Sequence, residues 1–283
     1  MRRTRPWRLV VLAAPLLAWL ISSRATAQPD SFHFVIIGDR TGEAQSAVYQ
    51  RVWQEAARED PAFVVGVGDT IEGSNDSAAE TEWVQVEQIL LPYRRYLLFL
   101  APGNHDIWSV RSEALFRKHA ARAPHYGFDY RQAHFTVLDN SRTEQLSQGE
   151  LDFLEKDLQA HKEQPLKFIV FHRPSWLIDA MFQNPHFAVH QLAKKYGVQY
   201  VVAGHLHQML DVELEGVTYL SMVSSGGHLR GTEQYRDGWF FGYALVAIGA
   251  KDIAFHVKEL KPPFGQGRIT ELGDWRRAGP VKN

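Results

Sequence analysis

The sequence predicts an α/β protein built as a four-layer α/β/β/α sandwich, with two mixed sheets flanked by helices. Apolar, strand-like runs alternate with helical patterns in the first half of the chain, and short strands with turn signals dominate the second half. The sequence shows neither an internal repeat nor a linker that would divide it after its N-terminal stretch. Because each sheet must bury an apolar face, two sheets packed between helices accommodate both halves in one domain.

Three apolar runs in the first half predict buried strands, and a helical pattern follows each one. The predicted strands are Phe32–Ile37, Phe63–Val67 and Tyr96–Leu100. The predicted helices span residues 44–58, 80–91 and 109–120. Asp60-Pro61 marks the end of the first helix, because helical backbone is disfavoured for the residue before a proline.

The second half has a more antiparallel character. Residues 126–130 and 134–138 predict an antiparallel pair around a turn. Ser147 and Glu150 form a capping-box pattern, and leucines at helical spacing after it predict a helix. The remaining predicted elements are a strand at 167–171, a helix at 187–196, a strand at 198–202 and further strands up to about residue 260.

Residues 1–27 match the pattern of a signal peptide. A basic segment with four arginines precedes the apolar run Leu9–Ile21, and Ala25-Thr26-Ala27 is a small-x-small cleavage site. The run is shorter than the ~20 residues that span a bilayer, which favours cleavage over a retained membrane anchor. We expect an exported protein, periplasmic or secreted, with a domain over residues 28–260 and a loosely ordered C-terminal tail over residues 261–283.

Charge and cysteine content exclude several classes of function. Without the five arginines of residues 1–27, the 31 basic residues fall to 26 against 32 acidic ones, a net charge of about −6. This balance gives no general affinity for nucleic acids or anionic membranes. The chain has no cysteine, so disulfides, thiolate metal sites and thiol nucleophiles are excluded. Any metal ion must be held by oxygen and nitrogen ligands.

Five predicted strands end in a side chain that can bind a metal ion. These residues are Asp39, Asp69, Asn104, His172, and His205 together with His207. Each alone has a simpler interpretation: the aspartates and the asparagine suit turns or helix N-caps, and a histidine can be a satisfied polar group. Because open sheets place their chemistry at the carboxyl ends of the strands, the five endings together indicate one site.

Two short segments carry most of this signal. Asn104, His105 and Asp106 place an amide, an imidazole and a carboxylate in consecutive positions after Gly103, where a packed core has little use for them. In Gly204-His205-Leu206-His207, the two histidines alternate, so in extended chain both imidazoles face one way.

The ordered set Gly38-Asp39, Gly68-Asp69, Gly103-Asn104-His105-Asp106, His172 and Gly204-His205-Leu206-His207 resembles the calcineurin-like metallophosphoesterases, which include the purple acid phosphatases. The resemblance implies hydrolysis of a phosphomonoester or phosphodiester by a metal-bridging hydroxide at a two-metal site. By the same resemblance, the first metal is held by Asp39 and His207, and Asp69 bridges to a second metal held by Asn104, His172 and His205. His105 is then the catalytic acid, and Asp106 orients its ring.

The chain departs from the family pattern at two positions. Thr41 stands where the family has a histidine, and Glu72 stands where purple acid phosphatases have a tyrosine. We therefore expect two divalent ions (Mn, Fe or Zn), the first bound more weakly, and no tyrosinate–iron colour. The alternative is a non-catalytic or weakly active descendant that binds a phosphorylated ligand in the cell envelope.

Three further residues are candidates for substrate binding. Arg40 and Arg173 adjoin proposed ligands, and a guanidinium suits bidentate phosphate contact; the simpler interpretation is a surface or ion-paired arginine. His228 follows Gly226-Gly227 and is a candidate for the same rim. The expected partner is a small-molecule or polymeric phosphoester, whereas the sequence predicts no oligomeric state.

Overall fold

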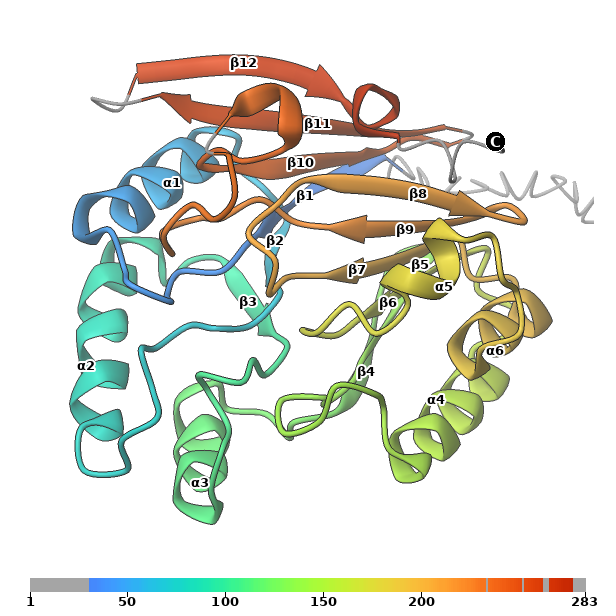
Figure 1. Ribbon diagram of the computed structural model, residues 1–283, viewed down its shortest axis with the longest axis horizontal. Helices are drawn as coiled ribbons and strands as arrows, with labels where there is room; N and C mark the ends of the chain where they lie inside the picture. The colour runs from blue at the N-terminus through green and yellow to red at the C-terminus, as the bar shows by residue number, and fades with distance from the viewer. Residues whose placement is uncertain (1–30, 233, 251, 262–264, 277–283) are drawn as a thin grey trace, which may run out of the picture.

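The computed structural model describes residues 31–276 except 233, 251 and 262–264, so the signal peptide predicted at residues 1–27 lies outside the described residues. Two six-stranded sheets pack face to face, with helices on their outer sides (Figure 1). Both sheets mix parallel and antiparallel pairs. The predicted fold class, a four-layer sandwich with two mixed sheets, is confirmed.

The first sheet has the strand order β12-β11-β10-β1-β2-β3. Its strands are β1 (Phe32–Ile37), β2 (Phe63–Gly66), β3 (Leu97–Leu100), β10 (Gly242–Ile248), β11 (Ile253–Lys261) and β12 (Gly265–Glu271). The second sheet has the order β4-β5-β6-β7-β9-β8. Its strands are β4 (Tyr126–Tyr130), β5 (Ala133–Val137), β6 (Leu166–Val170), β7 (Tyr200–Ala203), β8 (Leu210–Leu214) and β9 (Val217–Ser221).

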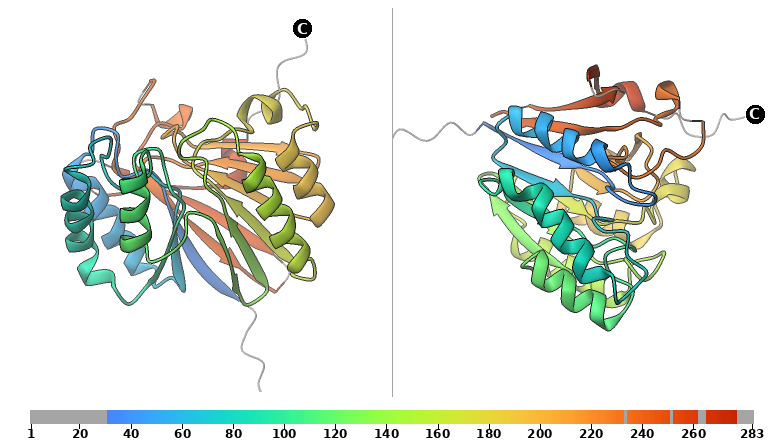
Figure 2. Two further views of the ribbon diagram at one scale, coloured as in Figure 1. Left: turned by 90° about the horizontal axis from the view of Figure 1, so that it is seen from below. Right: turned by 90° about the vertical axis from the view of Figure 1, so that its left-hand side faces the viewer.

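Helices cover the outer face of each sheet (Figure 2). The α-helices are α1 (Ser46–Arg58), α2 (Ala79–Leu90), α3 (Val110–His119), α4 (Gln148–Ala160), α5 (Leu177–Met181) and α6 (Ala188–Tyr196). The 3-10 helices of the described residues are η1 (Leu91–Tyr93), η2 (Tyr235–Asp237) and η3 (Leu272–Trp275). None of the helices within the described ranges is both long and apolar enough to span a membrane.

The alternation of side chains along β1 explains how the layers are joined. Phe34 and Ile36 point into the core between the sheets, whereas Val35 and Ile37 pack under α1. Phe34 stacks on Phe63 of β2 at 4.9 Å between ring centroids. It also meets Phe135 of the second sheet edge-on, at 5.3 Å. Such aromatic pairs stabilise the contact beyond the area they bury, so this phenylalanine cluster fixes one sheet against the other.

The start of α4 confirms half of the predicted capping box. The hydroxyl of Ser147 accepts a hydrogen bond from the N–H of Glu150 at 3.3 Å. The carboxylate of Glu150 does not return the bond to Ser147. It accepts from the N–H of Asp139 at 2.9 Å and contacts the ring of His125 at 2.7 Å.

The chain beyond Lys261 differs from the loosely ordered tail that its glycine and proline content predicts. Residues 265–271 form β12, an edge strand paired antiparallel with β11. Trp275 is buried in the core, where its indole N–H donates to the hydroxyl of Thr270 at 2.9 Å. The gain from burying a tryptophan outweighs the weak strand propensity of the glycines. Residues 277–283 lie outside the described residues.

Candidate metal centre

The loops after β1, β2, β3, β6 and β7 bring the predicted ligands together. The backbone N–H groups of Arg40 and Thr41 donate to the carbonyl of Asp69 at 3.1 and 3.2 Å, which joins the first two loops. The N–H of His105 donates to the Asp69 carboxylate at 2.9 Å. The N–H of His205 donates to the Asp39 carboxylate at 2.8 Å, which joins the two sheets at this edge.

Four of the predicted ligands form one half of the centre. The ligand atoms of Asp69, His172 and His205 all lie within 4.8 Å of one another. Asn104 adds its side-chain oxygen, 3.1 Å from Nε2 of His172. An aspartate, two imidazoles and an amide oxygen are ligands that Mn²⁺, Fe²⁺ and Zn²⁺ accept.

His172 is oriented by the backbone. Its Nδ1 donates to the carbonyl of Val67 at 2.9 Å, so Nε2 faces the carboxylate of Asp69 at 3.2 Å. Burial alone would lower the pKa of His172, but the negative charge of Asp69 raises it to about 9. The protonated ring in turn holds the pKa of Asp69 below its usual range, although burial acts against this. Burial and the charge of His172 lower the pKa of His205 to about 4.

Asp39 and His207 form the other half of the centre. His207 Nε2 lies 3.2 Å from the Asp39 carboxylate, and its Nδ1 faces the carbonyl of His228 at 2.7 Å. Burial favours the neutral ring, but the Asp39 carboxylate raises the pKa of His207. A carbonyl behind the ring fixes which nitrogen faces the centre, as metal-binding histidines require.

Unpaired buried atoms support a fit to metal ions. Within the described residues, Asp39 Oδ1 is buried without a hydrogen-bond partner, and Asp69 Oδ2 and His207 Nε2 each face an ionisable side chain at 3.2 Å without the geometry of a hydrogen bond. Buried polar groups are otherwise almost always hydrogen-bonded, because an unmade bond is costly. Cations between these atoms would supply the missing partners.

Two glycines allow the ligands to approach. A Cβ atom at Gly103 would lie 2.2 Å from Oδ1 of Asp69, and one at Gly204 would lie 2.4 Å from Oδ1 of Asp39. The backbone of Asp69, His205 and His207 is left-handed, with φ of 54°, 68° and 61°. Such φ values are uncommon for residues other than glycine and cluster at functional sites.

The carboxylate of Glu72 contacts the loop after β1. Its carboxylate accepts from the N–H of Ala44 at 2.8 Å and of Glu43 at 3.4 Å. Burial opposes ionisation, but the hydroxyl of the buried Thr41 and these N–H groups lower the pKa of Glu72. The side chain of Glu72 therefore fastens the loop after β1.

The structure differs from the expected role of Asp106. Its carboxylate accepts from the backbone N–H groups of Thr70, Ile71 and Gly103 at 2.8, 3.2 and 2.9 Å. Burial and the nearby charge of Asp69 raise the pKa of Asp106 to about 7. His105 Nδ1 instead contacts the carbonyl of Glu72. Asp106 thus joins the loops after β2 and β3. Its carboxylate is hydrogen-bonded to three backbone N–H groups and not to the ring of His105.

The three proposed substrate-binding residues have different surroundings. Arg40 donates to the carbonyl of Thr70 at 3.0 Å and lies over the ring of Tyr49. Arg173 forms an ion pair with Glu144 and is close enough to His205 to help lower the pKa of that ring. His228 lies beside His207, with ring centroids 5.8 Å apart.

Sequence reasoning missed Asn140, which supports the loop after β6. Its side-chain oxygen accepts from the N–H groups of His172 at 3.2 Å and Arg173 at 3.0 Å, and its amide donates to the carbonyl of Arg173 at 2.8 Å. A signal was present: Asn140 follows the apolar run that contains β5, as the other site residues follow theirs. Arg230 was also missed; its positive charge acts to lower the pKa of His207.

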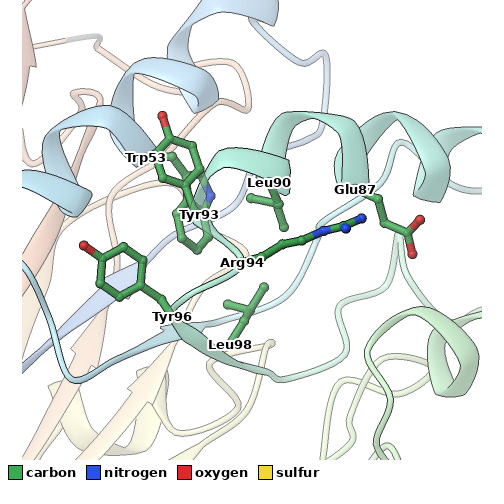
Figure 3. A pocket seen from close by; sticks show the side chains of 7 residues that line it. All are labelled: Trp53, Glu87, Leu90, Tyr93, Arg94, Tyr96 and Leu98. Atoms are coloured by element: carbon green, nitrogen blue, oxygen red, sulfur yellow. The ribbon is translucent and has the colours of Figure 1, made fainter.

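A cavity of about 290 Å³ adjoins the centre at His205. Its other lining residues are Glu144, Gln145, Pro174, Ser175, Leu177, Ile178 and Leu206. A different cavity, of about 320 Å³, lies between α1, α2 and β3 (Figure 3) and is lined by Trp53, Glu87, Leu90, Tyr93, Arg94, Tyr96 and Leu98. It contains none of the clustered ligands, so the smaller cavity at His205 is the one relevant to chemistry.

The chain resembles known phosphoesterases in sequence. Residues 32–209 match the family described as calcineurin-like phosphoesterase. The 3′,5′-cyclic adenosine monophosphate phosphodiesterase CpdA of Haemophilus influenzae is 25% identical over 227 residues, which cover 76% of this chain and 78% of that protein. The CpdA protein of Escherichia coli K12 is 26% identical over 202 residues, which cover 68% and 70%.

Among solved structures, GAP50, described as the anchor in the inner membrane complex of Plasmodium, is 15% identical, with a TM-score of 0.60 over 86% of this chain and 88% of that chain. This similarity supports the fold. The chain belongs to the calcineurin-like phosphoesterase family. It is a hydrolase of phosphoester bonds, and the family uses divalent metal ions.

Proposed function

We propose that the protein hydrolyses a small phosphodiester of the cyclic nucleotide type. The observation that carries this proposal is the convergence of six metal-ligand candidates, with unpaired buried atoms among them, beside the cavity at His205. Two CpdA relatives named as 3′,5′-cyclic adenosine monophosphate phosphodiesterases support the substrate class. The apolar wall of Leu177 and Ile178 suits an uncharged part of the substrate, such as a base.

The proposed centre divides into two shells joined by Asp69. Asp69, Asn104, His172 and His205 would hold one divalent ion, and Asp39, His207 and Asp69 the other. Bound ions would supply Lewis-acid activation of water, giving the attacking hydroxide, and would neutralise phosphate charge. The ion at His172 and His205 would have four protein ligands, whereas the ion at Asp39 and His207 would have three. We therefore propose weaker binding at Asp39 and His207.

His105 would act as the general acid. Its Nδ1–H donates to the carbonyl of Glu72, so Nε2 faces the centre, 4.0 Å from the Asp69 carboxylate, and carries the transferable proton when the ring is doubly protonated. The side chain is partly exposed and can meet a substrate. Transfer of this proton to the leaving oxygen would prevent a build-up of negative charge there.

Metal-dependent turnover tests the proposed function. The purified protein would be stripped with chelator, reloaded with Mn, Fe or Zn, and assayed with cyclic AMP and with chromogenic phosphomonoesters and diesters. We expect hydrolysis of the cyclic substrate only after reloading, and its loss in His205→Ala. Asp152→Asn, a change on the exposed face of α4, is the control and should keep full activity.

No turnover with any substrate at confirmed metal content would favour the alternative, a protein that binds a phosphorylated ligand without hydrolysis. Preference for a phosphomonoester would contradict the cyclic diester as the substrate but would still agree with phosphoesterase activity. The proposal also includes export, on the signal-peptide pattern of residues 1–27. N-terminal sequencing of the native protein should then begin near Gln28, and an intact Met1 would contradict export by cleavage.

A further inference from the structure

The segment between β9 and β10 carries an arginine, Arg230, that the chemistry proposed above does not use. This segment lies beside the loop after β1 (Figure 1). The N–H of Gly227 donates to the carbonyl of Asp39 at 3.2 Å, and the N–H of His228 donates to the carbonyl of Gly42 at 2.9 Å. These bonds hold the chain that leads to Arg230 next to a proposed metal ligand.

The guanidinium of Arg230 borders the same space as the ring of His207. Gly42, between them, has a left-handed backbone with φ of 85° and no side chain. A Cβ atom at Gly42 would lie 3.6 Å from Nη2 of Arg230 and 3.8 Å from Nε2 of His207. That nitrogen is the atom of His207 that faces Asp39. Arg230 is therefore close to the Asp39–His207 half of the metal centre, and its charge acts to lower the pKa of His207.

The guanidinium of Arg230 has no hydrogen-bond or ion-pair partner among the residues that the structure describes. Arg173, beside the other half of the centre, differs because it pairs with Glu144. Arg236, farther along the segment, lies 3.8 Å from the carboxylate of Asp237. Because Arg230 is half-buried, its charge is partly removed from water, and a bound anion would offset that cost.

The free charge lies on the side of the centre where the chain departs from the family pattern. Thr41 stands there in place of a histidine, which leaves Asp39, Asp69 and His207 as the protein ligands proposed for that ion. A guanidinium stays charged at all accessible pH, and its paired donors match two oxygens of a phosphate. Arg230 is therefore suited to neutralise phosphate charge on the side where the ion is bound more weakly.

We propose that Arg230 is a substrate-binding residue whose guanidinium donates hydrogen bonds to a phosphoryl oxygen on the Asp39–His207 side of the centre. The inference deepens the proposed function and rests on it for the presence of a phosphoester there. Arg40 and Arg173 already bond to a carbonyl and a carboxylate, whereas Arg230 breaks no bond to another described residue when phosphate binds. The same charge repels a cation, so it also weakens binding of the ion at Asp39 and His207.

Phosphate binding to the metal-loaded protein tests this role without turnover. The full chain would be loaded with Mn²⁺ and titrated by calorimetry with inorganic phosphate and with adenosine monophosphate. In Arg230→Gln, the loss of a charged hydrogen bond should weaken binding of both anions roughly tenfold or more. Arg230→Lys keeps the charge but not the paired donors, so it should bind them with intermediate affinity. Circular dichroism checks that both variants keep the fold.

The affinity for Mn²⁺ separates substrate binding from a structural role. The dissociation constant of Mn²⁺ would be measured for the same variants before phosphate is added. Because the guanidinium repels the ion, Arg230→Gln should bind Mn²⁺ as tightly as its parent or more tightly. A residue that only keeps the centre in shape would weaken Mn²⁺ and phosphate binding together, and that result would overturn the proposal. An unchanged phosphate affinity, or a loaded parent protein that binds no phosphate, would overturn it as well.

The matched control is Arg236→Gln. Arg236 lies in η2 of the same segment, and its side chain is 80% exposed. This variant should bind Mn²⁺ and phosphate like its parent, and a loss of phosphate affinity equal to that of Arg230→Gln would contradict a specific contact. A loaded parent protein that binds phosphate through Arg230 but hydrolyses no phosphoester would contradict the proposed function and leave this inference intact.

Discussion

Individual residues at the metal centre combine unusual backbone with confined space. Asp69, His205 and His207 have left-handed φ values, and Gly103 and Gly204 leave no room for a methyl group. The carboxylates and imidazoles therefore depend on a backbone that admits little change.

Gly204→Ala should damage the centre without unfolding the domain. Its Cβ would lie 2.4 Å from Oδ1 of Asp39 and 2.7 Å from Val67, so the ligand must shift. Misplacement by about 1 Å costs on the order of 100-fold in rate, and we expect that loss in kcat/KM. Gly149→Ala is the control, because the nearest atom to its Cβ is 3.8 Å away. A Gly204→Ala enzyme with normal activity would show that Asp39 has more freedom than the structure indicates.

His105→Ala should lower kcat by an amount that depends on the leaving group of the substrate, if His105 is the general acid. A general acid contributes roughly 100- to 10,000-fold, and only where the leaving oxygen needs a proton. We expect a large loss of kcat with a poor alkoxide leaving group and a small loss with a nitrophenolate. Equal losses with both substrates would assign His105 to binding rather than to proton transfer.

At the scale of the elements, the loops that follow the strands bring the proposed ligands together. The strand-end pattern predicts Asp39, Asp69, Asn104, His172 and the His205–His207 pair because it depends on local sequence. It did not reveal the partner of each side chain, because partners come from loops far apart in sequence. Asp106 and Glu72 are examples. The carboxylate of Asp106 accepts from three backbone N–H groups, and the carbonyl of Glu72 contacts the ring of His105.

Asn140→Ala should loosen the loop after β6. Its side chain satisfies the N–H groups of His172 and Arg173, and their burial without a partner costs about 1–3 kcal/mol. We expect a loss of that size in the free energy of unfolding, measured with urea, together with reduced activity. Asn140→Asp keeps an acceptor for the two N–H groups and should recover part of both. An unchanged urea midpoint in Asn140→Ala would contradict this role.

At the scale of the whole molecule, β12 and η3 complete the first sheet with a segment whose sequence predicts little order. The reason lies in tertiary packing: Trp275 meets Tyr235 and Phe240 with ring centroids 5.1 and 5.2 Å apart. Trp275→Ala should lower the free energy of unfolding by about 3–5 kcal/mol. Ile269→Ala, on the same segment but 49% exposed, should have little effect. Similar urea midpoints for the two variants would mean that Trp275 does not anchor the segment.

The metal centre also joins the two sheets, because Asp39 and Asp69 follow strands of the first sheet and His172, His205 and His207 follow strands of the second. Ions bound there stabilise only the folded state, by about 2.7 kcal/mol at 100 times the dissociation constant. We expect Mn²⁺ to raise the melting temperature of chelator-treated protein by roughly 5–10 °C. Asp152→Asn, on the exposed face of α4, should keep this shift, whereas His205→Ala should lose most of it. An unchanged melting temperature at confirmed Mn²⁺ occupancy would mean that the ions do not bridge the sheets.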